Sequence, residues 1–525
     1  MKAKHMRLLK ALSKWLHKYL GLLLLLFLMW MSISGILLNH PELISGLEVP
    51  GVLLPPQYRI ENWQQGAFNK AVFPESQPGM AIVSGKQGVW VSTNAGRSFH
   101  SFMEDGYPAS AYNRRTNDMI LIESGWEEYI VACSYNGVWS RRLPDGGWKR
   151  AMLPEDHARP KKLLQRRGEL LLVTESGILR SALKPARLSF TPMEVKKAGG
   201  YQVTMIRFFF DVHSGEILGL PGRLLIDAAG VICFILCFTA LYTWYYPKKL
   251  KARVRMKLKG KRKNPRLFKF LLKYHLDFGI WSAAVLLILA FTGMFMRPPL
   301  LVMLAGQRVD GNIYPGRGDN PWEHQIKNAA YDATTGQILL DCRDGMWFGP
   351  ADFSRPFRKI TLPVPAFVMG ATVMEFDSEG VLMLGSFNGL YKIHLPSGNF
   401  IDFIRGVPVG PSSNLQPGEF MVTGYMETPD GGQFISTFDR GLLHIGGRTA
   451  YGDFPMPREL QETQSMSLWH AMFELHNGRI FQDILGSWYI LLMPLGALLT
   501  IILTLTGVVD WVIVYRRKAR AAMKE

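Results

Sequence analysis

Four of the 12 histidines occupy matching positions in the two halves of the chain, and their type and spacing could hold a metal. His17 and His275 each open an H-x3-G segment, and in both copies a hydroxyl residue and a glycine follow 17 and 18 residues later. His213 and His476 each open an H-x-G-x-I segment, and a T-x4-W follows in both copies. Two imidazoles that face each other in a helical bundle are the axial ligands that a b-type haem requires.

The elements that carry these histidines are long apolar segments. A helix needs about 20 apolar residues to cross a bilayer, and four segments are long enough. They are residues 19–38, 228–246, 278–296 and 484–509. The first is too long for the apolar core of a signal peptide and no small-residue cleavage site follows it, so we expect a retained anchor. We predict a membrane protein built as a tandem duplication of helix, outer loop and helix.

The net charge of +18 is concentrated in three short segments beside the apolar ones. Residues 1–18, the loop 248–273 and the tail after Trp511 hold 24 of the 60 basic residues and 1 of the 42 acidic residues. Because Lys and Arg mark the cytoplasmic side, we predict that both termini and this loop are cytoplasmic. Orientation and contact with anionic membrane lipid account for these charges. With 19% charged residues, the composition argues against a nucleic-acid partner.

This orientation sorts the four histidines by side of the membrane. His17 and His275 begin outward-running helices at the cytoplasmic edge, whereas His213 and His476 precede inward-running helices at the outer edge. One haem near each face would form a two-step relay, with His40 as a spare outer ligand. Basic residues that could pair with haem propionates are Arg223, Arg479, Lys14 and Lys18. The alternative is that histidines at a membrane boundary only reach water or cap helices.

The two outer loops are rich in alternating β-forming residues and are punctuated by glycine and proline. Six times an apolar strand is followed by a short turn, a glycine, an aliphatic residue and a bulky residue. Within each loop these glycines are 40 to 52 residues apart, the length of a four-stranded propeller blade. They are Gly88, Gly137, Gly177, Gly345, Gly389 and Gly441.

The predicted fold is a membrane protein with four transmembrane α-helices in a tandem-duplicated bundle and an all-β periplasmic domain. Both outer loops form that domain, a propeller of six or seven blades, since closure removes unpaired strand edges. Helices with their flanking segments alternate with loops in this order: N-terminus and first helix, outer loop, second helix, basic loop, third helix, outer loop, fourth helix and tail. Their residues are 1–40, 41–205, 206–247, 248–274, 275–298, 299–470, 471–515 and 516–525.

The helical motifs resemble those of the PepSY-associated transmembrane helix family of bacterial inner-membrane proteins. The H-x3-G and H-x-G-x-I segments, with the later hydroxyl–glycine pair and the T-x4-W, carry this resemblance, which does not extend to the outer loops. Several members of the family resemble ferric-siderophore reductases that hold two b haems. The resemblance implies that His17 and His275 bind the iron of a cytoplasmic haem, and that His213 and His476 bind the iron of an outer haem.

The histidines and the resemblance predict a transmembrane electron-transfer protein of the bacterial inner membrane with two haem b groups. Electrons would pass from a cytoplasmic donor, a flavodoxin-like protein or reductase, to a periplasmic ferric chelate or redox partner. The chain would then act as a haem-dependent ferric-chelate reductase. Because no G-x-G-x-x-G occurs, it is not expected to oxidise NAD(P)H itself. The alternative is a non-enzymatic binding or regulatory protein, in which a propeller recognises a ligand and the helices only anchor it.

Overall fold

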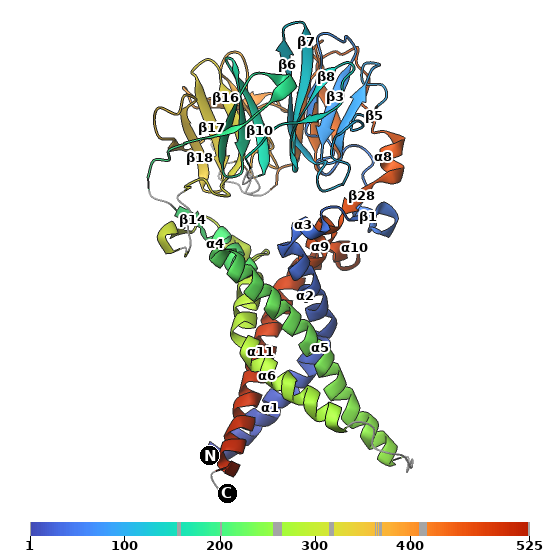
Figure 1. Ribbon diagram of the computed structural model, residues 1–525, viewed down its shortest axis with the longest axis vertical. Helices are drawn as coiled ribbons and strands as arrows, with labels where there is room; N and C mark the ends of the chain where they lie inside the picture. The colour runs from blue at the N-terminus through green and yellow to red at the C-terminus, as the bar shows by residue number, and fades with distance from the viewer. Residues whose placement is uncertain are drawn as a thin grey trace. The chain divides into compact units, whose positions relative to one another are not determined.

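The computed structural model describes residues 2–154, 159–199, 202–255, 265–313, 315, 320–362, 364, 366, 370–408 and 417–522. The chain forms two compact units (Figure 1). The helical unit comprises Met1–Ile44, Gln202–Arg317 and Trp469–Glu525, and the β unit comprises Ser45–Tyr201 and Gly318–Leu468. Each unit is therefore assembled from both halves of the sequence.

Long helices dominate the helical unit. They are α1 (Lys2–Leu23), α2 (Leu25–Asn39), α5 (Gly219–Arg255), α6 (Pro265–Met294) and α11 (Tyr489–Ala522). α11 packs against α1 and α6, and α5 packs against α2 and α6. Shorter elements flank them: α3 (Pro41–Ile44), α4 (Met205–Ser214), η4 (Glu216–Leu218), α7 (Leu301–Leu304), η5 (Gly311–Ile313), α9 (Leu468–His476), η6 (Arg479–Phe481), α10 (Gln482–Leu485), η7 (Gly486–Trp488), and the paired strands β14 (Gln202–Thr204) and β15 (Arg308–Asp310).

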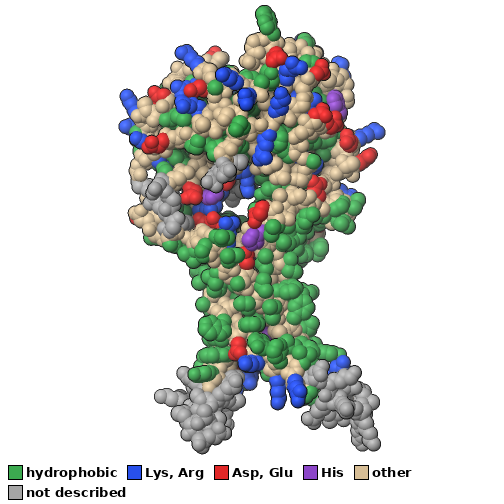
Figure 2. Space-filling model, in the orientation of Figure 1, with side chains coloured by type: hydrophobic (Ala, Val, Ile, Leu, Met, Phe, Trp, Pro, Cys, Tyr) green, Lys and Arg blue, Asp and Glu red, His purple; other side chains and the backbone are tan. Residues whose placement is uncertain are grey.

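Within the described part of the chain, three helical segments are long and apolar enough to cross a membrane by themselves: Glu216–Ala252, Pro265–Met294 and Arg479–Ile513. α1 and α2 meet that description only together, as a pair bent by 61°. On the face drawn in Figure 2, apolar side chains cover much of the surface of the long helices, and Trp281, for example, is 83% exposed. Such a surface is stable in lipid rather than in water. The chain is thus a membrane protein with an additional β unit.

Part of the predicted basic cytoplasmic loop lies outside the described residues. Of residues 248–274, the flanks 248–255 and 265–274 continue α5 and α6, whereas 256–264 are not described. The end of the C-terminal tail, 523–525, is likewise outside the described range.

The β unit consists of antiparallel sheets in which consecutive strands pair. The first sheet contains β2 (Lys70–Val72), β3 (Ala81–Gly85), β4 (Gly88–Ser92) and β5 (His100–Ser101). The second contains β6 (Thr116–Ser124), β7 (Glu127–Ser134), β8 (Gly137–Leu143) and β9 (Lys149–Arg150). The third contains β10 (Pro160–Arg166), β11 (Glu169–Thr174), β12 (Gly177–Ala182) and β13 (Thr191–Met193).

The second half of the β unit repeats this pattern. The fourth sheet contains β16 (Ile326–Asp332), β17 (Gln337–Cys342), β18 (Gly345–Pro350) and β19 (Arg358–Ile360). The fifth contains β20 (Val373–Phe376), β21 (Leu382–Ser386), β22 (Gly389–His394), β23 (Asn399–Asp402) and β24 (Val407–Pro408). The sixth contains β25 (Val422–Glu427), β26 (Gln433–Thr437) and β27 (Gly441–Gly446). Outside these sheets lie the paired strands β1 (Glu48–Pro50) and β28 (Ser465–Ser467), and the short helices η1 (Gly51–Leu53), η2 (Pro56–Tyr58), η3 (Pro185–Arg187) and α8 (Arg458–Thr463).

The six glycines that recur in the sequence have one structural role. They begin the third strand of each sheet, namely β4, β8, β12, β18, β22 and β27. All but Gly177 adopt a positive φ, between +76° and +143°, directly after a tight turn. At Gly441 a Cβ would collide with the backbone oxygen of Asn62, so only glycine fits there.

The first strands of neighbouring sheets lie in contact around the β unit. The contacts join β2 with β6, β6 with β10, β10 with β16, β16 with β20, β20 with β25, and β25 with β2. Buried aromatic residues fill the space between the sixth and first sheets, including Trp63, Phe434 and Phe454. The indole Nε1 of Trp63 donates to the backbone oxygen of Phe454 at 2.7 Å. Segments near the two ends of the β unit therefore hold its first and sixth sheets together.

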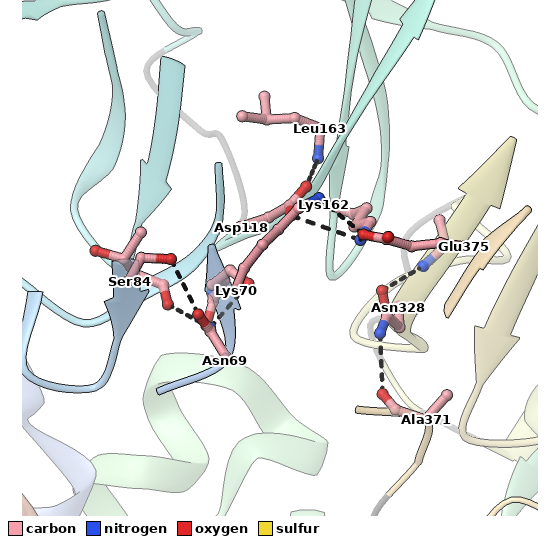
Figure 3. Close-up of polar contacts among 12 residues, drawn as sticks. Asn69, Lys70, Ser84, Asp118, Lys162, Leu163, Asn328, Ala371 and Glu375 are labelled. Atoms are coloured by element: carbon pink, nitrogen blue, oxygen red, sulfur yellow. Dashed lines mark hydrogen bonds and ion pairs between the residues drawn. The ribbon is translucent and has the colours of Figure 1, made fainter. Parts of the chain in front are cut away.

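An ion cluster joins the first strands of four sheets (Figure 3), and of its members Glu375 is 47% exposed. Lys70 Nζ lies 3.0 Å from Asp118 Oδ1 and 2.8 Å from Glu375 Oε1, and Lys162 Nζ lies 3.5 and 3.2 Å from the same atoms. Asp118 is 1% exposed and also accepts from the backbone nitrogen of Leu163 at 2.9 Å. Burial opposes ionisation of Glu375, but the two lysines hold its pKa well below the usual range. Two cations and two carboxylates thus compensate one another.

We predict that Asp118→Asn destabilises the β unit. Asp118 is buried, and removing one partner of a buried ion pair costs about 3 kcal/mol or more, because the largely buried lysines lose a counter-charge. At about 2–4 °C per kcal/mol, the melting temperature should fall by roughly 6–12 °C. Thermal unfolding of the detergent-solubilised chain measures this. Glu127→Gln, in the exposed pair that Glu127 forms with Arg142 at 2.9 Å, is the control and should leave the transition unchanged. An unchanged transition in Asp118→Asn would show that the cluster adds no stability.

Candidate functional site

The helical unit brings the four predicted histidines together in two pairs. His17 in α1 faces His275 in α6, with ring centroids 6.3 Å apart and ring planes at 73°. His213 at the end of α4 faces His476 at the end of α9, with centroids 6.2 Å apart and planes at 70°. We call these the first pair and the second pair. The two pairs have nearly the same geometry, and each pair takes one histidine from each half of the chain.

A hydroxyl group from a neighbouring helix contacts Nδ1 of every one of these imidazoles. Thr239 Oγ1 lies 2.8 Å from His275 Nδ1, and Thr506 Oγ1 lies 3.4 Å from His17 Nδ1. His17 Nδ1 is also 3.0 Å from the backbone oxygen of Leu503. Since a carbonyl can only accept a hydrogen bond, Nδ1 of His17 carries the proton.

The second pair follows the same arrangement. Thr292 Oγ1 lies 3.0 Å from His213 Nδ1, and Ser34 Oγ lies 2.9 Å from His476 Nδ1. Both hydroxyls already donate to the backbone of their own helices, at 2.7 Å, so their oxygens are left to accept from Nδ1. Thr239 and Thr506 donate to their own helices as well, at 3.0 and 2.8 Å. In all four imidazoles Nδ1 therefore carries the proton and Nε2 carries the free lone pair. In this tautomer Nε2 can bind a metal ion.

Glycines beside three of these hydroxyl residues make room for the rings. A Cβ at Gly507 would lie 2.9 Å from His17 Cε1, and one at Gly293 would lie 3.0 Å from His213 Cε1. A Cβ at Gly35 would lie 3.4 Å from His476 Cε1. The hydroxyl–glycine dipeptides of the sequence thus have a physical basis, since one residue orients an imidazole and the next permits its approach. The fourth position departs from this pattern, because Ala240 follows Thr239.

The sequence pattern showed the hydroxyl–glycine dipeptides but assigned them no partner. In the sequence, Ser34 and Thr292 are repeated positions within the first and third apolar segments. Thr239 and Thr506 are the first residues of the two T-x4-W motifs. Each contacts a histidine on another helix.

His40 lies outside the two pairs. Its Nε2 is 2.8 Å from Asp227 Oδ2, and its Nδ1 is 3.2 Å from Glu42 Oε1. The hydrogen bond to Asp227 raises the pKa of His40 above its ordinary value, with a smaller contribution from Glu42 and against the effect of burial. Both ring nitrogens thus face carboxylates, which suits a protonated imidazole rather than a metal ligand.

The predicted basic residues at the ends of the helices have carboxylate or aromatic neighbours. Arg223 Nε lies 3.3 Å from Glu216, and Arg479 Nε lies 3.4 Å from Glu474. Lys18 Nζ lies 5.1 Å from the centroid of the Tyr19 ring. Lys14 is exposed at the start of the bundle in α1.

The two histidine pairs fit a metal that brings further ligands of its own. A metal–imidazole bond of about 2.0–2.1 Å and an imidazole radius of about 1.1 Å place the two ring centroids about 6 Å apart across one metal ion. Among the described residues, no group of three or more histidine, cysteine or carboxylate side chains could hold an ion. A porphyrin supplies the equatorial ligands that the protein lacks. Near the second pair, the buried Nε of Arg297 and Nδ2 of Asn477 have no hydrogen-bond partner among the described residues and suit an anionic group such as a propionate.

Comparisons with known proteins match most of the chain to one family. A family model described as "PepSY-associated TM region" matches residues 14–513. No curated protein matches the chain. Two similar solved structures show the extracellular domain of a protein from B. thetaiotaomicron. One is named as that of a one component system and the other as that of a hybrid two component system. Each is 11% identical in sequence to this chain. The match covers 75% of this chain and 40% of the chain in the solved structure, and the TM-scores are 0.33 and 0.32. The chain thus spans 40% of the length of those chains, and a likeness at this level carries no inference.

Proposed function

Because the chain belongs to the PepSY-associated TM region family, we propose that it transfers electrons through a membrane between two b-type haems, one on each histidine pair. The observation that carries this proposal is the repeated geometry of the pairs. In each, two imidazoles lie 6.2 or 6.3 Å apart, with Nδ1 engaged by a hydroxyl group and Nε2 left as the ligand. A purely structural histidine has no reason to present this geometry twice.

The side chains around the pairs account for binding and orientation. A haem held by the histidines of one pair would supply one-electron transfer. The hydroxyl groups of Thr239, Thr506, Thr292 and Ser34 fix the ring orientations and hold the Nδ1 protons. Such second contacts raise the basicity of the metal-binding nitrogen. The apolar helices exclude water from the space between the pairs.

The proposal includes a finer description of the fold. α1 and α2 together form one bent span, which with the three single helices makes a bundle of four. The six sheets are the blades of a propeller, since their first strands contact one another in a cyclic order. The hydrogen bond from Trp63 to Phe454 links the ends of that propeller.

The charge distribution supports the orientation of the chain that the proposal uses. The basic segments 1–18, 248–273 and 512–525 are on the cytoplasmic side of the bacterial inner membrane, and both termini lie there. An acidic donor such as a flavodoxin-like protein or a reductase would be attracted to this side. Electrons leave on the periplasmic side to a ferric chelate or a redox partner, and the chain then acts as a ferric-chelate reductase.

The absorption spectrum of the purified chain tests the proposal. After haem-replete expression, we expect two b-type haems per chain, with a Soret band that shifts and an α-band that sharpens on reduction by dithionite. Haem extraction and quantification against protein concentration give the ratio. A folded chain with no Soret band would refute electron transfer by haem and favour the non-enzymatic binding protein.

A further inference from the structure

Cationic side chains surround one aromatic ring in the β unit. The guanidinium carbons of Arg115 and Arg159 lie 4.6 and 5.0 Å from the ring centroid of Tyr135. Lys161 Nζ lies 3.5 Å from Glu175, and its charge also acts on Tyr135. We call Arg115, Arg159 and Lys161 the cationic cluster. It shares no residue with the two histidine pairs or with the ion cluster around Asp118.

Backbone hydrogen bonds between turns and strand ends position the cationic cluster. In the turn between β7 and β8, Tyr135 N donates to the backbone oxygen of Arg115 at 3.0 Å. In the matching turn of the third sheet, Glu175 N donates to the oxygen of Arg159, also at 3.0 Å. The oxygen of Glu175 then accepts from Ile326 N of the fourth sheet at 3.0 Å. The cluster therefore lies where the turns of consecutive sheets are joined by backbone hydrogen bonds.

The cluster is electrostatically positive. Burial raises the pKa of Glu175, but the hydrogen bond from His324 and the charges of Lys161 and Arg159 lower it to about 2. Burial also raises the pKa of Tyr135, yet the three cations outweigh it and lower that pKa below its usual value. Glu175 is one carboxylate beside three cations, so the ion pairs of the described residues leave positive charge unbalanced.

One donor of the cluster lacks an acceptor. Arg115 Nε is buried and makes no hydrogen bond within the described part of the chain. Arg159 Nη2 donates to the hydroxyl of Tyr112 at 3.1 Å, which keeps its guanidinium beside the Tyr135 ring. A buried cationic donor without an acceptor is costly, and an anionic oxygen would remove that cost.

We propose that the cationic cluster is a binding site for a small polycarboxylate, either free or as the chelate of a trivalent metal. Planar guanidinium groups match carboxylates because they donate two parallel hydrogen bonds. Two arginines and a lysine suit a ligand with at least two carboxylates. The chelate form rests on the proposed transfer of electrons to a ferric chelate, whereas binding of a free polycarboxylate does not, and neither depends on bound haem.

Titration calorimetry of the full chain in detergent tests the site with two probes, citrate and gallium(III) citrate. Gallium is not reduced under these conditions, so binding is measured independently of any haem. We expect at least one probe to bind, more weakly at high salt. Equal binding of both probes identifies the carboxylate as the ligand, and binding of the gallium complex alone identifies the metal chelate.

Variants decide whether the binding belongs to this site. The double variant Arg115→Gln, Arg159→Gln should weaken binding about tenfold or more, since charge-assisted hydrogen bonds are lost. Lys161→Gln, which leaves the stacking on Tyr135 intact, should weaken it about threefold or more. Arg142→Gln is the matched control, because Arg142 belongs to β8 and pairs with the exposed Glu127. If neither probe binds, or if all variants bind the probe equally well, the proposal is wrong.

Discussion

His275→Ala is expected to lower the haem content from two groups per chain to one. A b-type haem held by two imidazoles depends on both, and alanine cannot replace a ligand. The histidines of the second pair lie on α4 and α9 and are oriented by Thr292 and Ser34, whereas His275 is oriented by Thr239. The second site should therefore stay filled. Haem quantification and the reduced spectrum measure the loss, and His213→Ala should give the reciprocal result.

His40→Ala is the matched control, because His40 is a half-buried histidine of the same unit that faces Asp227 and Glu42. It should keep both haems. If His275→Ala lost both haems while thermal unfolding of the chain stayed unchanged, the two sites would not be independent. If it lost none, His275 would not be a ligand.

The positions of the four histidines could be predicted from the sequence because a tandem duplication records them twice. The match of H-x3-G to H-x3-G and of H-x-G-x-I to H-x-G-x-I selects four of 12 histidines without any knowledge of the fold. The sheets were predictable for a similar reason. Glycine recurs wherever the turn before a third strand demands a positive φ, as at Gly137 and Gly389.

The contacts that orient the histidines could not be predicted, because they join segments far apart in the chain. Thr506 and His17 are 489 residues apart, and Ser34 and His476 are 442 apart. The bend between α1 and α2 left no clear pattern either, since apolar residues run through it without interruption. Charge pairing was similarly hidden. The ion pair of Arg479 with Glu474 is evident only from the positions of α9 and η6 in the structure.

Gly293→Val is expected to empty the second haem site and to leave the first one filled. Gly293 lies on α6, the helix of His275, yet its missing side chain faces the His213 ring, where a Cβ would lie 3.0 Å from Cε1. The branched side chain of valine has to displace that imidazole, because the helix backbone cannot move by enough in a packed bundle. An imidazole that is displaced from its partner can no longer hold the iron with it. Haem content should fall from two to one.

Gly279→Val separates this effect from a general cost of valine on α6. Gly279 belongs to the H-x3-G motif of the same helix, but a Cβ there meets nothing within 4 Å, so both haems should remain. Double variants then identify the emptied site. Two substitutions that empty the same site remove one haem in total, whereas two substitutions that empty different sites remove both haems. Gly293→Val with His213→Ala should still bind one haem, whereas Gly293→Val with His275→Ala should bind none. The opposite assignment would mean that Gly293 serves the histidine of its own helix, and the pairing of helices described for these sites would be wrong.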